Sequence, residues 1–231
     1  MKACLAQFKS CSDVRINLRR HGEAVERAAA AGCDFVLFPE LSLTGYEPRI
    51  ASREAVAPDD VLFNPLVDAS SVHGIVIAAG MPLKATNGTE IGLVVCRPGR
   101  PVATYAKQIL HSDEVPYFVP GHRQLDLTVG EHRIAPAICY EAMLPEHGEA
   151  AVARGATIYA ASVTKHASGM ESARAYLAAF ASRHSIPVLL VNAIGPSDTF
   201  ESSGGSVAFN SAGALIDSLD DAEGELVVEL S

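Results

Sequence analysis

Residues 133–146 read RIAPAICYEAMLPE, an apolar run that leads into a cysteine and is followed by a proline and a glutamate. The run predicts a strand that ends at Cys139, and the proline predicts a short helix from Pro145 to Arg154. Pro136 lies inside this strand and lacks a backbone N–H, so we expect a bulge or an unpaired position there. A thiol on a turn between a strand and a helix lies near free backbone N–H groups, which lower its pKa and can bind an oxyanion.

Two earlier segments also present one reactive side chain at the end of an apolar run. FVLFPELSLTGYEP (residues 35–48) places Glu40 after a short buried strand, where partial burial would raise its pKa towards that of a general base. ATYAKQILHSDE (residues 103–114) places Lys107 just beyond another strand. A base, a cation that stabilises an oxyanion and a thiol that attacks carbon are the groups needed to cleave an amide by covalent catalysis.

Each of these side chains also has an ordinary explanation when it is taken alone. Cys139 could be a buried strand-end cysteine, Glu40 a solvated loop acid and Lys107 a surface lysine. Glu114 could hold Lys107, bind a substrate amide or be another loop acid. Tyr46 belongs to a loop of defined shape and would support the site. The shared position of the three reactive groups at strand ends favours a functional interpretation.

Buried strands alternate with helices in both halves of the chain. Helices are expected from Asp13 to Ala31, with Asp13 as the N-cap, from Ala51 to His73 and from Met170 to His184. The small side chains expected to form the close-packing face of the last helix are Ala175, Ala178, Ala179 and Ser182. Strands are expected in MKACLAQF, GIVIAAGMP, QLDLTV, TIYAASV, IPVLLVNAIG, GGSVAFN, GALIDSL and GELVVEL, with a hairpin in EIGLVVCRPGRPVATYA. The combination predicts an α/β layered sandwich with mixed sheets.

The composition favours one domain spanning residues 1–231, because no linker or low-complexity segment divides the chain. Apolar residues make up 48% of it, yet no apolar run approaches about 18 residues and the N-terminus lacks a secretory signal, so we expect a cytoplasmic protein. The net charge of −9 argues against nucleic acid and anionic membranes as partners. The five cysteines form no CxxC pair and the eight histidines no HExxH motif, which argues against a metal site and fits free thiols.

Three segments together resemble the signature sequences of the nitrilase superfamily of carbon–nitrogen hydrolases. They are FPELSLTGY, YAK followed by a glutamate and the FxxG of residues 118–121, and ICYE. The resemblance continues through RGATIYAAS, PVLLVNAIG and GGSVAFNSAGALI to ELVVEL, and so covers essentially the whole chain. It implies a four-layer αββα sandwich of two mixed sheets, a homodimer or larger homo-oligomer, and no metal or organic cofactor. The chain lacks the C-terminal tail that many relatives use across their dimer interface, which leaves the oligomeric state open.

The resemblance also implies a role for each reactive residue. Glu40 would be the general base, Lys107 the oxyanion stabiliser and Cys139 the nucleophile. Glu114 matches the second glutamate of the family, and the backbone N–H of Tyr140 would complete the oxyanion hole.

Differences from the family pattern concern the substrate. Many small-amide hydrolases carry an arginine that meets a substrate carboxylate where this chain has Met143. A neutral or cationic substrate therefore fits better, unless Lys165, His166 or Arg49 supplies the positive charge; of these, Lys165 is expected to help to position the substrate. Nitrile-cleaving members usually carry a tryptophan after the cysteine, whereas this chain has a tyrosine there, so an amide is favoured over a nitrile.

We therefore expect hydrolysis of the C–N bond of a small linear amide or N-carbamoyl compound through a cysteine thioester, with release of ammonia or an amine. The alternatives are a catalytically silent binding or scaffold protein and nitrile hydrolysis by the same triad. Acyl transfer is disfavoured because relatives that perform it are embedded in membranes, and a glutamine-dependent synthetase because no second domain is present to use the ammonia. The choice among amides, ureido compounds and nitriles depends on loops such as residues 45–57 and 161–170.

Overall fold

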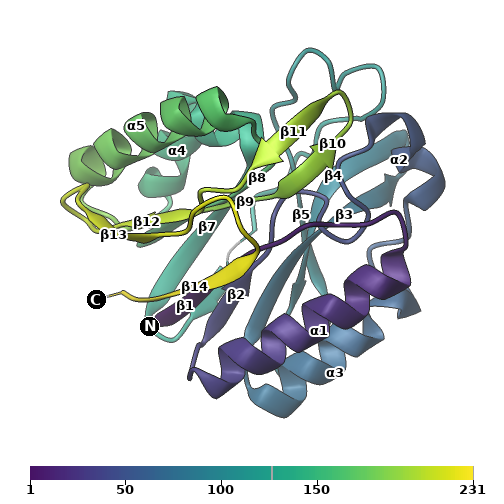
Figure 1. Ribbon diagram of the computed structural model, residues 1–231, viewed down its shortest axis with the longest axis horizontal. Helices are drawn as coiled ribbons and strands as arrows, with labels where there is room; N and C mark the ends of the chain where they lie inside the picture. Colours follow the sequence, from purple (N-terminus) through teal and green to yellow (C-terminus); the bar gives the residue numbers. More distant parts are fainter. Residues whose placement is uncertain (126, 231) are drawn as a thin grey trace.

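Two six-stranded sheets packed face to face form the centre of the computed structural model, which describes residues 1–125 and 127–230 (Figure 1). The strand order is β14-β1-β2-β3-β4-β5 in the first sheet and β13-β12-β9-β8-β7-β6 in the second. In each sheet three neighbouring strands are parallel, β1 to β3 and β7 to β9, and the remaining pairings are antiparallel. Both sheets are therefore mixed, as the sequence predicts.

The strands of the first sheet are β1 (Lys2–Gln7), β2 (Phe35–Leu37), β3 (Val76–Ala85), β4 (Gly88–Cys96), β5 (Ala103–Ala106) and β14 (Gly224–Glu229). Those of the second sheet are β6 (Leu127–Val129), β7 (His132–Ile138), β8 (Ile158–Val163), β9 (Val188–Asn192), β12 (Val207–Phe209) and β13 (Leu215–Ser218). A separate hairpin consists of β10 (Ile194–Ser197) and β11 (Phe200–Ser203). The helices are α1 (Val14–Ala30), α2 (Pro48–Glu54), α3 (Asn64–His73), α4 (Pro145–Ala153) and α5 (Ala167–His184), with 3-10 turns η1 (Val61–Phe63) and η2 (Cys139–Met143).

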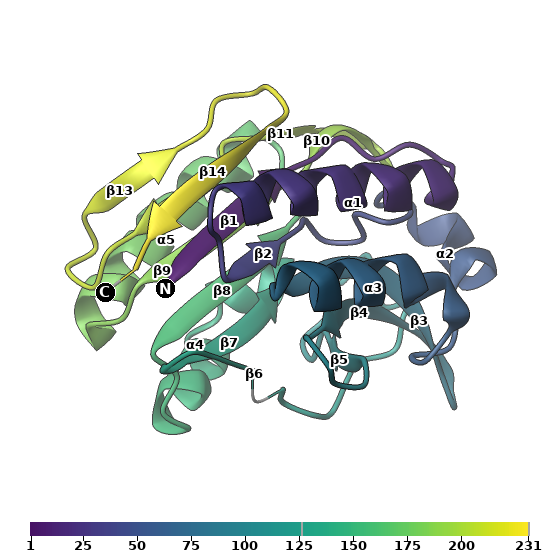
Figure 2. The ribbon, with the colours of Figure 1, turned by 90° about the horizontal axis from the view of Figure 1, so that it is seen from below.

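Helices cover the outer face of each sheet and complete the four layers. Helices α1 and α3 lie on the first sheet, and α4 and α5 lie on the second (Figure 2). Asp13 is the N-cap of α1, as predicted: its carboxylate accepts hydrogen bonds from Arg15 N and Ile16 N at 2.8 and 3.3 Å. The αββα sandwich expected from the sequence is confirmed.

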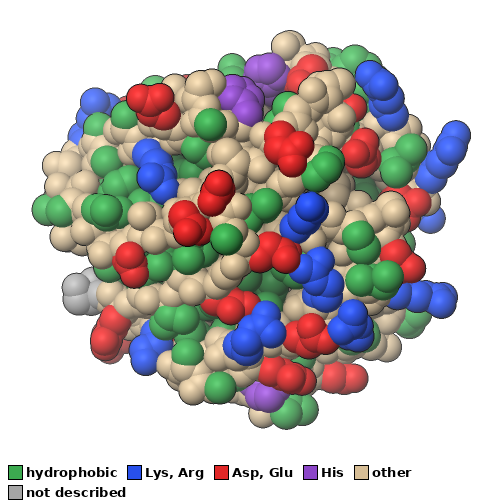
Figure 3. Space-filling view, in the orientation of Figure 1, with side chains coloured by type: hydrophobic (Ala, Val, Ile, Leu, Met, Phe, Trp, Pro, Cys, Tyr) green, Lys and Arg blue, Asp and Glu red, His purple; other side chains and the backbone are tan. Residues whose placement is uncertain are grey.

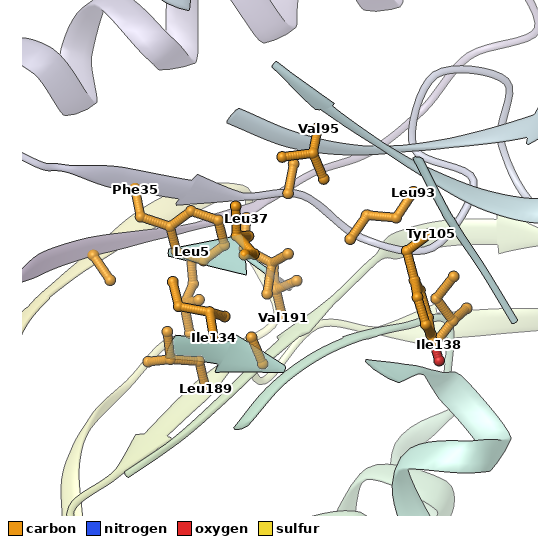
Figure 4. Packing of buried hydrophobic residues seen from close by; sticks show 14 of the residues in the cluster. Leu5, Phe35, Leu37, Leu93, Val95, Tyr105, Ile134, Ile138, Leu189 and Val191 are labelled. Carbon is orange, nitrogen blue, oxygen red and sulfur yellow. The ribbon is translucent and has the colours of Figure 1, made fainter. Parts of the chain in front are cut away.

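The alternation of side chains along the buried strands explains why their sequences are almost continuously apolar. In β1, Ala3 and Leu5 face the second sheet, whereas Cys4 points to the helices on the other side. Each such strand is buried on both faces and needs apolar residues at every position. Figure 4 shows the layer between the sheets, where Leu37 of the first sheet and Val191 of the second are among the packed side chains.

Two helical predictions are wrong in detail. Residues 51–73 do not form one helix, because the chain becomes extended at Ala55, forms a bridge from Val56 to Leu83 and turns through η1 before α3 begins. In α5 the buried side chains are Met170, Ala173, Leu177, Phe180 and Ala181. The predicted close-packing face is instead exposed or only half-buried, at Ala175, Ala178, Ala179 and Ser182. The bulky side chains of α5 face the sheet because they bury more apolar area than the small ones.

Two strand predictions differ from the structure in detail. The hairpin of β10 and β11 was not predicted, because its sequence mixes glycine, proline and serine with few apolar residues. Pro136 stands opposite Ala160 in a regular register between β7 and β8, so the expected bulge is not found on that side. The described pairs between β7 and β6, from His132 to Ile134, do not include Pro136.

The surface carries charges of both signs. Figure 3 shows acidic and basic side chains interspersed over one face, so the negative net charge of the chain does not form a single acidic patch on that face. No helix within residues 1–125 or 127–230 is long and apolar enough to cross a membrane.

The loop that follows β2, residues 39–45, is pressed against β3 at Gly80. Gly80 N donates a hydrogen bond to Ser42 Oγ at 3.2 Å. A Cβ atom on Gly80 would lie 2.2 Å from Leu41 N, which is a steric clash. Only glycine, which has no Cβ, fits at this position without displacing the loop. This contact fixes the main chain on both sides of Glu40.

Substitution of Gly80 by alanine should therefore lower the free energy of unfolding by about 1–3 kcal/mol, because the added methyl group must displace main-chain atoms. Gly22→Ala is the matched control: its Cβ meets nothing within 4 Å, and alanine inside α1 should be neutral or stabilising by up to about 1 kcal/mol. Urea unfolding followed by circular dichroism measures both variants. Equal stability of the two would contradict the close approach.

Candidate active site

The three predicted reactive residues meet because their strands end at the same edge of the sandwich. Strand β4 is antiparallel to β3 and β5 is antiparallel to β4, so β5 runs in the direction of β2 and β3. Glu40 follows β2 and Lys107 follows β5. Cys139 follows β7 in the facing sheet, whose β8 is tied to the Glu40 loop by a hydrogen bond from Ser162 Oγ to Phe38 O at 2.8 Å.

Lys107 is completely buried between two carboxylates. Its Nζ donates to Glu40 Oε1 at 3.0 Å and to Glu114 Oε1 at 2.5 Å. Burial lowers the pKa of Lys107, but Glu40, Cys139 and Glu114 together outweigh this effect and raise the pKa well above its ordinary value. Lys107 is therefore a permanent ammonium, and with two ionised partners the cluster would carry one net negative charge.

Glu40 uses only one of its two carboxylate oxygens for a hydrogen bond. Its Oε2 is buried and has no hydrogen-bond partner in the described part of the chain. Burial raises the pKa of Glu40, against the lowering effect of Lys107. The Cys139 thiol is close enough to lower the same pKa. A buried acceptor without a partner is uncommon in folded proteins, and here it leaves the oxygen available for a proton.

Cys139 occupies the sharp turn between β7 and η2 with φ of 50°, in the left-handed region that non-glycine residues rarely adopt. Its Sγ lies 3.7 Å from Thr164 O, as donor to that carbonyl. Burial, and then the Glu40 carboxylate, raises the pKa of Cys139 to about 11, although Lys107 and Lys165 lower it. The expectation that the turn lowers this pKa is wrong, because burial and the nearby carboxylate prevail. The thiol is protonated at neutral pH.

Glu114 is not a solvated loop acid. It is buried, and its Oε1 accepts hydrogen bonds from Lys107 and from Tyr46 OH, the latter at 3.1 Å. Its Oε2 accepts one from His111 N at 2.7 Å. Glu114 therefore holds Lys107, and Tyr46 holds Glu114.

The sequence pattern did not indicate Glu141, a second buried carboxylate. Its Oε1 accepts hydrogen bonds from Ile138 N at 2.8 Å and Tyr105 OH at 2.7 Å. Its Oε2 accepts from Gln108 N at 2.6 Å and Ile109 N at 3.2 Å. A glutamate inside the apolar segment ICYEAML was the available signal, since a buried charge requires several partners.

A cavity of about 290 Å³ opens beside Cys139. Its wall includes Tyr46, Tyr140, Lys165 and Phe200, and Phe200 belongs to the hairpin that was not predicted. The three predicted reactive residues and the supporting residues are thus brought together around or directly behind this cavity. Within residues 1–125 and 127–230, no group of three or more His, Cys, Asp or Glu side chains could hold a metal ion.

Arg49, one of the three candidates to supply a positive charge for the substrate, lies beside Tyr117 on the surface and not at the cavity. Met143, which stands where many relatives have an arginine, packs against the core beneath α4 and α5. Lys165 and His166 both line the cavity, so they are the candidates that remain.

The chain belongs to the carbon–nitrogen hydrolase family, whose model matches residues 2–231. An amidase from Nesterenkonia sp. AN1 superposes with a TM-score of 0.91 at 27% identity, covering 100% of this chain and 93% of that one. A CN-hydrolase superfamily protein from Xanthomonas campestris shares the fold, with a TM-score of 0.92, 19% identity, and coverage of 100% and 90%.

Curated relatives are longer than the part that this chain matches. A hydrolase from Mycobacterium tuberculosis is 27% identical over 169 residues, which cover 69% of this chain and 60% of that protein. A glutamine-dependent NAD(+) synthetase from Thermotoga maritima is 22% identical over 227 residues, which cover 94% of this chain and 39% of the synthetase.

Glu40→Gln should lower the pKa of Cys139, since the Glu40 carboxylate is the second largest influence that raises it. Thiolate formation in the unmodified protein should have its midpoint near pH 11, and the variant should reach its midpoint at a lower pH. The variant should therefore react faster with iodoacetamide at mildly alkaline pH, measured by mass spectrometry of the Cys139 peptide. Glu47→Gln removes a charge from the same loop region without touching the thiol and should leave the midpoint unchanged. An unchanged or higher midpoint in Glu40→Gln would show that the carboxylate does not act on Cys139.

Proposed function

We propose that this carbon–nitrogen hydrolase cleaves a small linear amide or N-carbamoyl compound through a thioester on Cys139, with Glu40 as general base and Lys107 as oxyanion stabiliser. The observation that carries the proposal is the unpartnered Oε2 of Glu40, next to a buried ammonium and to the protonated thiol of Cys139, which itself lines the cavity. A base with a free acceptor, a nucleophile with a proton to lose and a fixed cation are complementary groups.

In the acylation half of the reaction, Cys139 Sγ attacks the carbonyl carbon while Glu40 takes the thiol proton. The carbonyl oxygen becomes negative and is stabilised by the Lys107 ammonium and by the backbone N–H of Tyr140. The C–N bond then breaks, and Glu40 returns the proton to the leaving nitrogen, which departs as ammonia or an amine. The acyl group remains on sulfur as a thioester.

In the hydrolysis half, a water molecule occupies the place of the departed amine. Glu40 accepts a proton from this water as its oxygen attacks the thioester carbon, and the same oxyanion site stabilises the second tetrahedral intermediate. The C–S bond breaks, sulfur recovers a proton from Glu40, and the carboxylic acid is released. The cycle leaves the three groups in their original protonation states.

The supporting residues fit this cycle through their contacts. Glu114 and Tyr46 hold the Lys107 ammonium against Glu40, so the cation does not have to reorganise when the oxyanion forms. Lys165 lines the cavity and would position the substrate.

Similar proteins support a covalent route and an amide substrate. In the Nesterenkonia amidase, glutamate-to-glutamine variants carry covalent products of acrylamide and fluoroacetamide at the active-site cysteine. The Thermotoga relative is a glutamine-dependent synthetase, which makes glutamine one candidate amide. Nitrile hydrolysis by the same residues and a silent scaffold remain the alternatives. A cytoplasmic homodimer or larger homo-oligomer is part of the proposal as well.

Release of ammonia from a panel of short amides, L-glutamine, N-carbamoyl amino acids and nitriles tests the proposal. Cys139→Ala should lower the rate with any active compound by at least about a thousandfold, because the nucleophile is lost. Cys11→Ala, which removes a partly exposed cysteine outside the cavity, should keep full activity.

Equal release by the native protein and Cys139→Ala would exclude the covalent mechanism. Release from nitriles alone would favour the nitrile alternative. No release from any compound, together with a Cys139 that resists iodoacetamide, would favour the scaffold.

A further inference from the structure

Lys165 presents a charged group to the cavity from a fixed main chain. It lies between β8 and α5, where Asn192 Oδ1 accepts a hydrogen bond from Lys165 N at 2.8 Å and Asn192 Nδ2 donates one to Lys165 O at 3.0 Å. Lys165 and Cys139 line the same cavity. Within the described residues, the Lys165 ammonium has no hydrogen-bond or ion-pair partner, in contrast to Lys107.

The acidic side chains around the cavity already have partners. Glu114 binds Lys107, and Asp113 lies 2.5 Å from His111 Nδ1 at the exposed end of the cavity. His166 uses its Nδ1 as the N-cap acceptor of α5, at 3.3 Å from Gly169 N. Of the Asp, Glu and Lys side chains in the described wall, Lys165 alone lacks a partner.

We propose that the substrate is a small amide that carries a carboxylate, and that the Lys165 ammonium binds this carboxylate. The inference rests on the proposed amidase function and names its substrate class. An ammonium in a partly enclosed site forms charge-assisted hydrogen bonds with a carboxylate that are stronger than neutral ones. Such a substrate would also supply the partner that Lys165 lacks.

The size and the apolar walls of the cavity limit the substrate further. A volume of about 290 Å³ lies at the lower end of the range for small-molecule sites. The rings of Tyr46 and Phe200, with centroids 6.1 Å apart, can cover a few methylene groups between the amide and the carboxylate. Lys165 and Cys139 both line this cavity, so one small molecule that fills it can contact both residues. Half-amides of short dicarboxylic acids and N-carbamoyl amino acids fit this description.

Succinamate and succinamide test the inference, because they have nearly the same shape and differ in one carboxylate. The native protein should have a higher kcat/KM for succinamate than for succinamide. Lys165→Met should reduce kcat/KM for succinamate by about 10- to 100-fold and change kcat/KM for succinamide little. Lys84→Met, at an exposed position of β3 outside the cavity, is the matched control and should change neither. Equal losses on both substrates, or a preference for succinamide or a cationic amide, would overturn the carboxylate site and leave the amidase function standing.

Binding in the absence of turnover separates the inference from the proposed function. Calorimetry with Cys139→Ala protein should show succinamate binding that Lys165→Met weakens by a similar factor. If that binding is found but the native protein turns over no amide, the anion site stands and the amidase proposal fails. Tighter binding of N-carbamoyl amino acids than of succinamate would also support the site. It would show that the carboxylate belongs to the part of the substrate that leaves as the amine.

Glu141 supports a second inference, which depends on main-chain contacts and not on the cavity. One carboxylate accepts hydrogen bonds from the two residues after Lys107, through Gln108 N and Ile109 N, and from the residue before Cys139, through Ile138 N. We infer that Glu141 is a positioning residue that fixes the Lys107 segment relative to the Cys139 turn. Effective oxyanion stabilisation requires such fixed geometry, since a shift of about 1 Å can cost a hundredfold in rate.

Glu141→Gln tests this role, because its amide would turn N–H groups towards main-chain donors. It should reduce kcat by about 10- to 100-fold with little change in KM, and it should raise the pH midpoint of Cys139 alkylation, since Lys107 lowers the pKa of that thiol. Ser70→Ala is the control: it removes the hydrogen bond from the buried Ser70 Oγ to Ile75 O, at the end of α3, and touches neither segment, so it should cost stability but not kcat. If Glu141→Gln does not fold, Tyr105→Phe replaces it in the same measurements, because it removes one hydrogen bond to Glu141. If Glu141→Gln or Tyr105→Phe lowers stability but leaves kcat and the pH midpoint of Cys139 alkylation at their native values, Glu141 has a purely structural role.

Discussion

The ion cluster of Lys107 with Glu40 and Glu114 is the constraint on which the site depends. A completely buried ammonium is tolerated only if carboxylates surround it, and two carboxylates so close together are tolerated only if a cation lies between them. Each of these residues thus requires the others to be in place. The cluster leaves one oxygen of Glu40 without a partner, and this oxygen is the group that the proposed chemistry uses.

The structure around the cluster serves to keep its three contributors in register. Gly80 admits the Glu40 loop, Ser162 ties this loop to the facing sheet, and Glu141 joins the segment after Lys107 to the turn at Cys139. None of these contacts involves the cavity itself. Residues outside the cavity can therefore affect catalysis as strongly as those that line it.

The sequence predicted the fold and the meeting of Glu40, Lys107 and Cys139, because both follow from where apolar runs end and from a strong family resemblance. It failed where the answer depends on tertiary surroundings. The pKa of the Cys139 thiol is raised because the thiol is buried and Glu40 lies nearby in space, and the buried face of α5 is set by the sheet beneath it. Glu141 was missed because three of its four partners described above are main-chain groups, which no sequence pattern displays.

The pairing of β1 with β14 has a consequence for how the chain acquires its structure. These strands join the two ends of the described chain in an antiparallel ladder from Lys2–Glu229 to Gln7–Gly224 (Figure 1). During synthesis β1 is made before every other strand of the described chain, and the edge that pairs with β14 stays open until β14 has been made. Contacts of such long sequence separation form late and slow folding, so the nascent protein carries an open strand edge that invites aggregation. The charged side chains of β14, Glu225 and Glu229, can limit this hazard only once β14 has been made, so the period before then is the most vulnerable one for this protein.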